Sequence, residues 1–452
     1  MITEIKLPRF NIIYAEYNYL NLHHVIGSGD WLPVEKPLDK EHFINITNQP
    51  DKLNIMIVGR NTYEGFLKRN IKFSDRILIV VSTTMPPSAF VARSLDEALK
   101  LCIGDNLNIN VIGGKKLYEA AIRHPCLDKI YKSWLYRLDT APKDPIIFSY
   151  EGKNKQFFKD LGHGFNVHTY NEISNYEYRY IELINKIIKT PTRPDRTGVG
   201  CHGIFSAELE ADLTEGFPLI TGRRISLRLI FEELMWFIRG QTDAKILQDL
   251  NVKIWNGNTS KEFINLRKLN YDEGQAGPIY GYQWRNWGGD QLAKVIDGLK
   301  VDPFSRRHLV SAWNIEDLDK MVLPPCHFGF QFYVDAPTNS QKRLSCKVFM
   351  RSTDVMLGLP FNVASYSLLT IMIAQVVGME PYKVVISMTD AHIYSNHMEG
   401  VKEYLTRKYN NLPTIEISKK LSSLADIEAL KDEDIILHNY YPSDIIKMDM
   451  AA

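Results

Sequence analysis

Short apolar runs alternate with amphipathic segments along the first third of the chain. The runs are six to eight residues long and rich in Ile and Val, which is typical of strands buried in a sheet. Between them, residues 94–102 predict a helix in which Ser94 is the cap and Leu95 and Leu99 share a face. This alternation predicts an α/β domain with a mainly parallel sheet flanked by helices. The predicted strands are residues 10–15, 54–59, 76–82, 108–114, 129–136 and 165–170.

The hydrophobic pattern changes near Ser174. Residues 150–159 are a polar stretch before the last strand of the first region, and residues 175–189 then begin an amphipathic helix. We therefore expect two domains, residues 1–173 and residues 174–452, joined by a short linker.

Composition argues against several classes of protein. The 452 residues include 54 Lys and Arg and 53 Asp and Glu, and this net charge of +1 predicts no field that would attract nucleic acid. The N-terminus lacks the apolar core of a signal peptide, and the longest apolar stretch, around residues 368–377, is too short to span a bilayer. We expect a soluble, cytoplasmic protein with no membrane anchor.

The cysteines predict free thiols in a reducing compartment and no metal site. They are scattered, odd in number, and show neither a CxxC motif nor the Cys/His spacing of a zinc site. The five are Cys102, Cys126, Cys201, Cys326 and Cys346.

Cys326 is the candidate nucleophile. It lies in LPPCHFGFQFYV, between a rigid Pro-Pro turn and an alternating strand, with the arginine-bearing motifs SRRH upstream and FMRSTD downstream. A cysteine attacks as its thiolate, and nearby arginines favour the thiolate by lowering the pKa. A buried structural cysteine is the commoner alternative.

Two acidic residues fall on the apolar faces of predicted helices. Glu233 has Leu229 and Phe237 as its helical neighbours, whereas Glu232 faces polar Arg228 and is expected at the surface. A carboxylate on an apolar face has a raised pKa and suits proton transfer.

Asp39 shares its helical face with Phe43, four residues later. A lone acid in a dry cleft can deliver a proton near neutral pH. The simpler alternative remains open, because Asp is favoured in the first turn of any helix.

Two segments, VGRNTYEG and IGGKKLYEAAI, each end a strand and open a helix. Gly113 and Gly114 permit close backbone approach, the helix N-terminus attracts phosphate, and Arg60 and Lys116 add positive charge. A Gly-Gly pair in such a turn is more often only a turn.

Taken together, these features resemble the dihydrofolate reductase family across roughly residues 9–172. The motifs are VIG at 25–27, LP at 32–33, Asp39, Phe43, Thr47, GRNTYE at 59–64, Arg76 and IGGKKLY at 112–118. The resemblance implies that Asp39 protonates the pterin with support from Ser133, and that Phe43 and Arg76 bind folate. The NADPH-binding residues that it implies are Gly27, Gly59, Arg60, Asn61, Thr62, Thr83, Gly113, Gly114 and Lys116.

The first region departs from this family at two places. Val34 stands where the family has Trp, although Trp31 is near, and the segment Tyr17–Val25 is several residues longer. Both departures would affect how the protein closes over its cofactor and how fast it turns over substrate.

The second region closely resembles thymidylate synthase, an α+β fold that dimerises through its sheet. The motifs are DRTGVG, FPLITGRR, LMWFIRG, GPIYGYQWR, SRRH, LPPCH, RSTD, GLPFNVASY, DAHIYSNH and KMDMAA. The resemblance implies Cys326 as nucleophile toward C6 of dUMP and Glu233 as proton carrier. The implied phosphate ligands are Arg196, Arg351 and Ser352, with Arg306 and Arg307 donated by the partner of a homodimer.

Other implied contacts recognise the base, the ribose and the folate. Asn362 both donates and accepts, which matches the uracil edge, whereas the similar dCMP hydroxymethylases carry Asp. His392 and Tyr394 would hold the ribose hydroxyl. The implied folate ligands are Asp354, Trp255, Asn258 and the terminal segment with Ala451. Met350 replaces the family's Gln, and Thr389 replaces a Gly, which would strain the backbone if its φ were positive.

We therefore expect a bifunctional enzyme of the dihydrofolate reductase–thymidylate synthase kind. It would make dTMP with methylenetetrahydrofolate and recycle dihydrofolate with NADPH, without a metal. Three alternatives remain: a degenerate reductase half, which Val34 suggests; an RNA-binding role; and dCMP hydroxymethylation, which Asn362 argues against.

Overall fold

The computed structural model describes residues 2–19, 22–28, 37–86, 88, 90–104, 106–122, 124–135, 145–148, 155–160, 165–170, 175–336 and 341–449. These residues form two compact units. The smaller unit comprises Lys6–Ile173 with Tyr409–Asn411, and the larger comprises Met1–Ile5, Ser174–Lys408 and Leu412–Ala452. The first five residues, which we expected in the first domain, therefore group with the larger unit.

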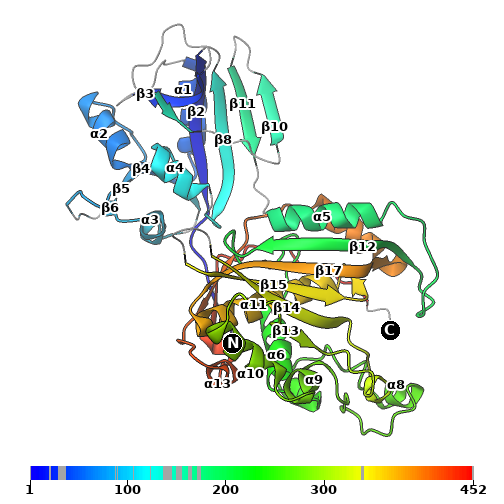
Figure 1. Ribbon diagram of the computed structural model, residues 1–452. Helices are drawn as coiled ribbons and strands as arrows, with labels where there is room; N and C mark the ends of the chain where they lie inside the picture. The colour runs from blue at the N-terminus through cyan, green and yellow to red at the C-terminus, as the bar shows by residue number, and fades with distance from the viewer. Residues whose placement is uncertain are drawn as a thin grey trace. The chain divides into compact units, whose positions relative to one another are not determined.

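The smaller unit is a twisted, mainly parallel sheet with helices against it (Figure 1). Its main strand order is β10-β11-β8-β2-β7-β4-β5-β6, and β2, β4, β5, β6, β7 and β8 pair in parallel. The strands are β2 (Phe10–Tyr19), β3 (Leu22–Ser28), β4 (Leu53–Gly59), β5 (Ile77–Val81), β6 (Val91–Ala92), β7 (Leu107–Val111), β8 (Leu127–Leu135), β9 (Pro145–Ile147), β10 (Lys155–Asp160) and β11 (Phe165–Tyr170). The helices are α1 (Pro37–Thr47), α2 (Arg60–Lys68), α3 (Leu95–Leu101) and α4 (Lys115–Ala121).

The six predicted strands of this unit are confirmed, and so is the capped helix. Ser94 accepts a hydrogen bond from the backbone N–H of Glu97 over 3.1 Å at the start of α3. The polar stretch expected at residues 150–159 is in part a strand, because β10 pairs with β11 and fills the edge of the sheet. The lengthened segment after Tyr17 continues β2 and returns as β3.

The larger unit is built on a six-stranded mixed sheet of order β12-β17-β15-β14-β13, with β16 beside β17. Its strands are β12 (Cys201–Asp212), β13 (Leu309–Ser311), β14 (His327–Asp335), β15 (Arg343–Met350), β16 (Thr353–Asp354) and β17 (Glu380–Tyr394). A second sheet joins β1 (Thr3–Ile5), β19 (Ile435–His438) and β18 (Thr414–Ile417).

Several helices of the larger unit pack on this sheet or on one another. The helices of this unit are α5 (Asn175–Ile187), α6 (Leu227–Ile238), α7 (Lys245–Asp249), α8 (Lys261–Leu266), α9 (Tyr280–Asn286), α10 (Gln291–Val301), α11 (Gly358–Val377), α12 (Met398–Thr406) and α13 (Leu424–Glu428). The 3-10 helices are η1 (Leu318–Lys320), η2 (Ser395–His397) and η3 (Asp432–Asp434).

Helix α11 corrects our estimate of the longest apolar segment. It runs for 20 residues, so by length and composition it could cross a membrane, whereas we expected the stretch around 368–377 to be too short. Most of it is buried against β15 and β17, as in the core helix of a globular domain (Figure 1). The helix ends at Gly378, whose φ of 69° gives the left-handed cap that favours glycine.

The central sheet buries one face and leaves the other more exposed. Along β15, Leu344, Cys346 and Val348 are buried, while the alternating residues are only half-buried. On the same sheet, Phe205 is 85% exposed and Tyr333 is 66% exposed. The half-buried residues of β15 include Arg343, Ser345 and Lys347, so the more exposed face mixes polar with large apolar side chains.

Candidate active sites

Cys326 immediately precedes β14, and two neighbours fix it. Its backbone N–H donates a hydrogen bond to the hydroxyl of Tyr280 over 2.9 Å. The guanidinium of Arg351 lies 3.8 Å from its Sγ. A nucleophile is useful when its backbone is rigid and a cation stands beside it.

Arg351 is aimed at the thiol by the Pro-Pro turn. Its Nε donates to the carbonyl of Pro325 over 2.9 Å, and its Nη2 donates to the carbonyl of Pro324 over 2.8 Å. The proline rings fix φ, so these carbonyls belong to a stiff turn that holds the arginine in place.

Burial has the larger effect on the pKa of Cys326, but the expected effect of a nearby arginine is present, because Arg351 lowers the pKa of the thiol. Burial raises the pKa of the thiol, and the charge of Arg351 and the contact with Tyr280 oppose only part of that rise. The single chain alone therefore does not make a low-pKa thiolate.

Tyr280 and His327 complete the surroundings of Cys326, and neither was singled out from the sequence. Their rings stack with centroids 4.1 Å apart, and the Nδ1 of His327 lies 2.8 Å from the hydroxyl of Tyr366. Burial lowers the pKa of His327 to about 3, so its imidazole is neutral. Tyr280 was visible only as part of the motif GPIYGYQWR, which carries no chemical signal of its own.

The glycine of that motif allows α9 to approach α6. A Cβ on Gly281 would lie 2.2 Å from the carbonyl oxygen of Phe237. Only glycine permits this approach, which places the ring of Tyr280 4.9 Å from that of Phe237.

Glu233 lies on α6 and is held by one donor. The indole N–H of Trp255 donates to its Oε1 over 2.8 Å. Burial nevertheless raises its pKa to about 7, as the helical pattern predicted. Glu232 was expected at the surface but is only 7% exposed, because this part of α6 is covered on both sides.

Strand β16 brings the RSTD and DAHIY motifs together. Asp354 pairs in register with His392, and the backbone N–H of Val355 donates to the carbonyl of His392 over 2.9 Å. The Nδ1 of His392 lies 3.1 Å from Asp390. Asp354 also accepts from the backbone N–H groups of Met356 and Leu357, in the turn that precedes α11.

The ring of Tyr394 lies 5.0 Å from that of His392. Burial and the charges of Asp354 and Asp195 raise the pKa of Tyr394 to about 12, while Arg196 opposes them. The predicted phosphate and ribose ligands Arg196, His392 and Tyr394 thus fall in one region, together with Asp354.

The remaining predicted residues of the synthase region take different positions. Asn362 lies one helical turn after Gly358 in α11, and Ser352 and Asn258 are half-buried in loops. Arg306 and Arg307 are exposed. Ala451 lies outside the described residues.

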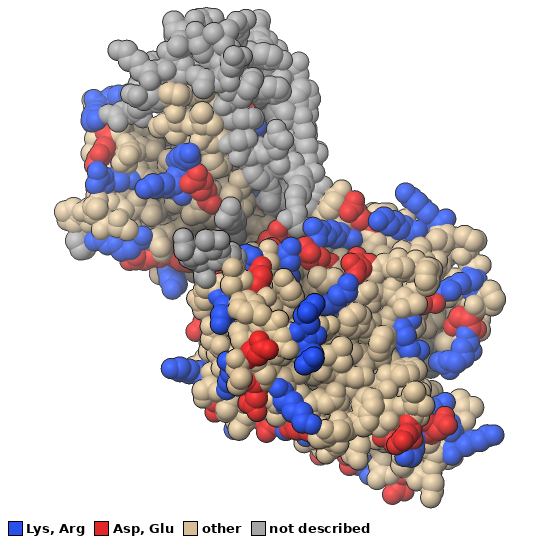
Figure 2. Space-filling view, in the orientation of Figure 1, with Lys and Arg blue, Asp and Glu red and all other residues tan. Residues whose placement is uncertain are grey.

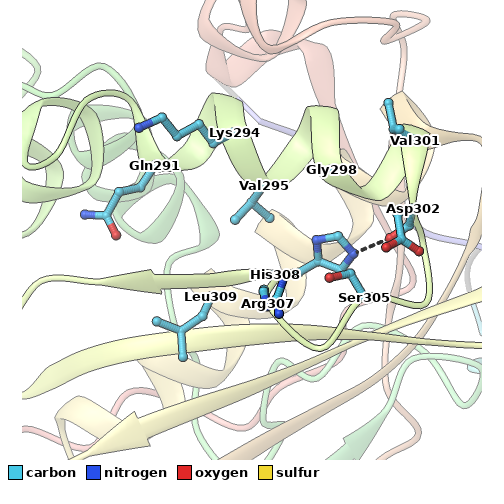
Figure 3. A pocket seen from close by; sticks show the side chains of 10 residues that line it. All are labelled: Gln291, Lys294, Val295, Gly298, Val301, Asp302, Ser305, Arg307, His308 and Leu309. Atoms are coloured by element: carbon cyan, nitrogen blue, oxygen red, sulfur yellow. Dashed lines mark hydrogen bonds between the residues drawn. The ribbon is translucent and has the colours of Figure 1, made fainter.

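The arginine pair is carried on a loop anchored by His308. The Nε2 of His308 lies 2.9 Å from the backbone oxygen of Asp302, and the residue is 4% exposed (Figure 3). The imidazole faces Gly298 of α10 in a cavity of about 340 Å³, of which Arg307 also forms part (Figure 3).

In the smaller unit, Asp39 lies in the first turn of α1. Burial raises the pKa of its carboxyl group, and a hydrogen bond with Ser133 of β8 lowers it in part. Ser133 is 2% exposed, and Asp39 is half-buried. The predicted pairing of the two side chains is therefore present.

The predicted glycines meet at the carboxyl ends of β4 and β7. The N–H of Gly59 donates to the carbonyl of Gly113 over 2.6 Å. A Cβ on Gly113 or Gly114 would approach the hydroxyl of Thr62 to 3.3 and 3.1 Å, and Gly113 has φ of 135°. The backbone is bare here, which is what a pyrophosphate needs.

Charged and polar residues surround these glycines. Arg60 is exposed, forms an ion pair with Glu64, and donates to the hydroxyl of Thr84 over 2.6 Å. The sequence analysis predicted Thr83 at this site but did not predict Thr84, which contacts Arg60. Three further predicted residues are exposed, namely Asn61, Thr83 and Lys116. Gly27 lies in β3 and pairs with Ile146 of β9.

Arg76 precedes β5 and reaches the end of α1. Its Nη1 donates to the hydroxyl of Thr47 over 2.9 Å, and Thr47 in turn donates to the carbonyl of Phe43 over 2.7 Å. The guanidinium also lies 5.3 Å from the ring of Phe73. Phe43 packs against the core cluster of Met56, Val58, Val80 and Ile112.

The structure describes two of the residues that depart from the family patterns, Met350 and Thr389. Val34 and Trp31 lie outside the described residues. Met350 is buried and receives a hydrogen bond from Thr353. Thr389 is exposed and has no positive φ; instead Ser206, on neighbouring β12, has φ of 61°.

Comparison with known proteins assigns one enzyme family to each region. The thymidylate synthase family model matches residues 178–452, and the dihydrofolate reductase family model matches residues 11–142. Two enzyme domains on one chain define a bifunctional enzyme.

Bifunctional dihydrofolate reductase-thymidylate synthases align along nearly the whole chain. The protein of Leishmania major is 34% identical, with 99% of this chain and 96% of the relative covered. That of Zea mays is 33% identical, with 94% of each covered, and that of Paramecium tetraurelia is 34% identical, with 96% and 97% covered. This chain belongs to the bifunctional dihydrofolate reductase–thymidylate synthases.

Proposed function

We propose that this chain methylates dUMP to dTMP at Cys326 and reduces the resulting dihydrofolate at Asp39. Both reactions are those of its family. The observation that carries the proposal is the grouping of Cys326, Arg351, Tyr280 and Glu233 in one site. The product of one reaction is the substrate of the other, so one chain serves both.

In the synthase site, the thiolate of Cys326 attacks C6 of dUMP. The new S–C bond moves the electron pair of the C5–C6 double bond to C5, which becomes nucleophilic. C5 bonds to the methylene carbon of methylenetetrahydrofolate and then loses its proton. The bond between that carbon and the folate nitrogen breaks, and the folate gives a hydride to the carbon and leaves as dihydrofolate. Expulsion of the thiolate at the end restores the double bond and frees Cys326.

Arginines favour the thiolate form of Cys326 and bind the phosphate of the substrate. Burial alone favours the thiol, and Arg351 opposes it only in part. The dianionic phosphate of dUMP needs donors that can bind two oxygens at once. In the same subunit, Arg196, Arg351 and Ser352 bind it. Arg306 and Arg307 of the second copy would add two further cations.

Glu233 carries protons because its pKa of about 7 lets it exist in both forms near neutral pH. The hydrogen bond from Trp255 orients the carboxylate. Asn362 matches the donor and acceptor of the uracil edge, and His392 and Tyr394 hold the ribose. We assign Asp354, Trp255 and Asn258 to binding of the folate.

In the reductase site, Asp39 holds the proton for the pterin ring, and its raised pKa keeps that proton available. Ser133 orients it. Phe43 packs against the pterin, and Arg76 pairs with the glutamate carboxylate of the substrate.

The bare backbone of Gly59, Gly113 and Gly114 fits a dinucleotide, because a side chain there would fill the space. NADPH, when bound, supplies the hydride. Asn61 and Thr62 would lie along it with Gly27, while Arg60, Thr83 and Lys116 would face the 2′-phosphate.

A covalent adduct tests the synthase proposal directly. The chain is mixed with methylenetetrahydrofolate and 5-fluoro-dUMP, whose fluorine cannot leave C5 as a proton does, so the adduct should persist on Cys326. Intact-mass measurement should show the added mass in the native chain and none in Cys326→Ser. Adduct formation by Cys326→Ser would contradict the assignment.

We further propose a homodimer that forms through the exposed sheet face. Phe205 and Tyr333 are large exposed apolar residues of this sheet, and the side chains of Arg306 and Arg307 are exposed. Pairing two such faces buries apolar area and brings each arginine pair toward the other copy.

Mixing two inactive variants tests the donation of arginines. Cys326→Ser keeps the arginines, and Arg307→Ala keeps the cysteine, so reassorted heterodimers would contain one complete site. Dissociation and reassociation should restore about a quarter of native dTMP formation. No recovery despite verified heterodimers would mean that Arg307 serves its own subunit.

The surface agrees with a protein that binds small molecules. On the described part of the face drawn in Figure 2, Lys and Arg are interspersed with Asp and Glu. A field of one sign, which nucleic-acid binding needs, does not cover that face. We propose a cytoplasmic enzyme with domains near residues 1–173 and 174–452.

A further inference from the structure

A ladder of asparagines crosses the buried sheet of the smaller unit. Asn11 of β2, Asn110 and Asn108 of β7, and Asn54 of β4 follow one another, and the last three are at most 4% exposed. Their side-chain amides join in sequence over 3.3, 3.0 and 2.8 Å. Apolar residues are usual at such positions in a parallel sheet.

The ladder ends on the last turn of α1. Both hydrogens of the Asn108 amide are used, one on Asn54 and one on the carbonyl of Ile46 over 2.8 Å. Asn54 in turn accepts from the backbone N–H of Gln49 over 3.0 Å and donates to its carbonyl over 3.0 Å. The amides therefore satisfy the carboxyl end of α1, where helical carbonyls lack partners.

The residue after Ile46 is Thr47, which is fully buried and accepts from the guanidinium of Arg76. A displacement of the end of α1 moves this hydroxyl and so changes where the guanidinium points. Among the residues that the structure describes, Arg76 has one other hydrogen bond, from Nε to the carbonyl of Ser74 over 3.2 Å, which leaves its remaining N–H groups for a carboxylate.

We propose that Asn108 is a positioning residue that aims Arg76 at the carboxylate of the folate tail. The inference rests on the proposed role of Arg76. Asn108 touches no substrate; it acts through Ile46, Thr47 and the guanidinium. The amide ladder keeps the end of α1 in register with the sheet. At Asn108 and Asn54 every polar side-chain atom is bonded, and a satisfied buried network of this kind specifies one arrangement.

The test compares two substrates of the reductase reaction in the full chain. Dihydrofolate carries the glutamate tail, and dihydrobiopterin lacks it. Asn108→Leu has nearly the same volume without the amide, so KM for dihydrofolate should rise about tenfold, the loss of one well-aligned ion pair. The kcat for dihydrofolate and the kcat/KM for dihydrobiopterin should stay within about twofold.

Two control variants sharpen the comparison. Arg76→Leu should show the same tail-specific loss, and Asn11→Leu, at the far end of the ladder, should show none. The dTMP formation by each variant reports the state of the rest of the chain. If Asn108→Leu does not fold, Asn108→Ser, too short to reach Ile46, should give the same split.

The outcomes separate the inference from the function on which it rests. Equal loss with both substrates, or no loss, in Asn108→Leu beside a tail-specific loss in Arg76→Leu would overturn the role of Asn108 alone. An Arg76→Leu variant without tail-specific loss would overturn the role of Arg76 and the inference together.

Discussion

The indole N–H of Trp255 donates to Oε1 of Glu233 over 2.8 Å, and this hydrogen bond lowers the pKa of that carboxyl. Burial outweighs the bond and leaves the pKa at about 7. The pair explains how an acid on an apolar helix face remains able to ionise at neutral pH.

Replacing Trp255 by Phe should raise the pKa of Glu233 further, because a donor to the carboxylate favours its ionised form. The limb of the pH profile of dTMP formation that reports Glu233 should therefore move to higher pH. Steady-state rates across pH 5 to 9 measure this. Trp287→Phe, at a partly exposed indole that makes no bond to Glu233, should leave the profile in place. A shift to lower pH would contradict the account.

Glu233 should make the synthase unit less stable as pH rises from about 4.5 to about 7. In this window the unfolded chain has lost the proton and the folded chain retains it, so the free energy of unfolding falls with pH. The contribution is at most about 3 kcal/mol, and partial solvent access reduces it. Glu233→Gln should flatten the slope in denaturant titrations, and an unchanged slope would count against a raised pKa.

Gly281→Ala should destabilise the synthase unit by about 1–3 kcal/mol, because its Cβ would meet the carbonyl of Phe237 at 2.2 Å. It should also displace Tyr280 and slow dTMP formation. Gly257→Ala is the matched control, since nothing lies within 4 Å of its Cβ. Thermal unfolding measures both, and equal midpoints for the two variants would contradict the close packing of α9 on α6.

Asn362→Asp should transfer preference from dUMP to dCMP. The carboxylate accepts from the amino group of cytosine but repels the uracil carbonyl, and it lacks the donor that this carbonyl needs. The ratio of kcat/KM for the two nucleotides in competition should fall by about a hundredfold or more. A ratio that stays constant would remove Asn362 from base recognition.

Local patterns predicted most of the parallel strands and the candidate residues. The strand at 54–59 and the cap at Ser94 depend on neighbours in sequence, which periodicity detects. Glu233 was found the same way, since its helical neighbours define an apolar face.

Features that depend on distant residues were missed or wrong. β1 pairs with β19, more than four hundred residues away, and this placed the first residues with the larger unit. Glu232 is covered by elements beyond its own helix. The pKa of Cys326 depends on how deeply the fold buries the thiol. The local sequence shows that arginines are near, but it does not show how deeply the cysteine is buried.

The oxidation of NADPH by the full chain tests the central claim most directly. It should follow dihydrofolate alone, and also dUMP with methylenetetrahydrofolate, because the synthase then makes the dihydrofolate. Cys326→Ser should abolish only the second signal, and Asp39→Asn should abolish both while dTMP still forms. Absence of the first signal in the native chain, with dTMP still forming, would contradict a working reductase half.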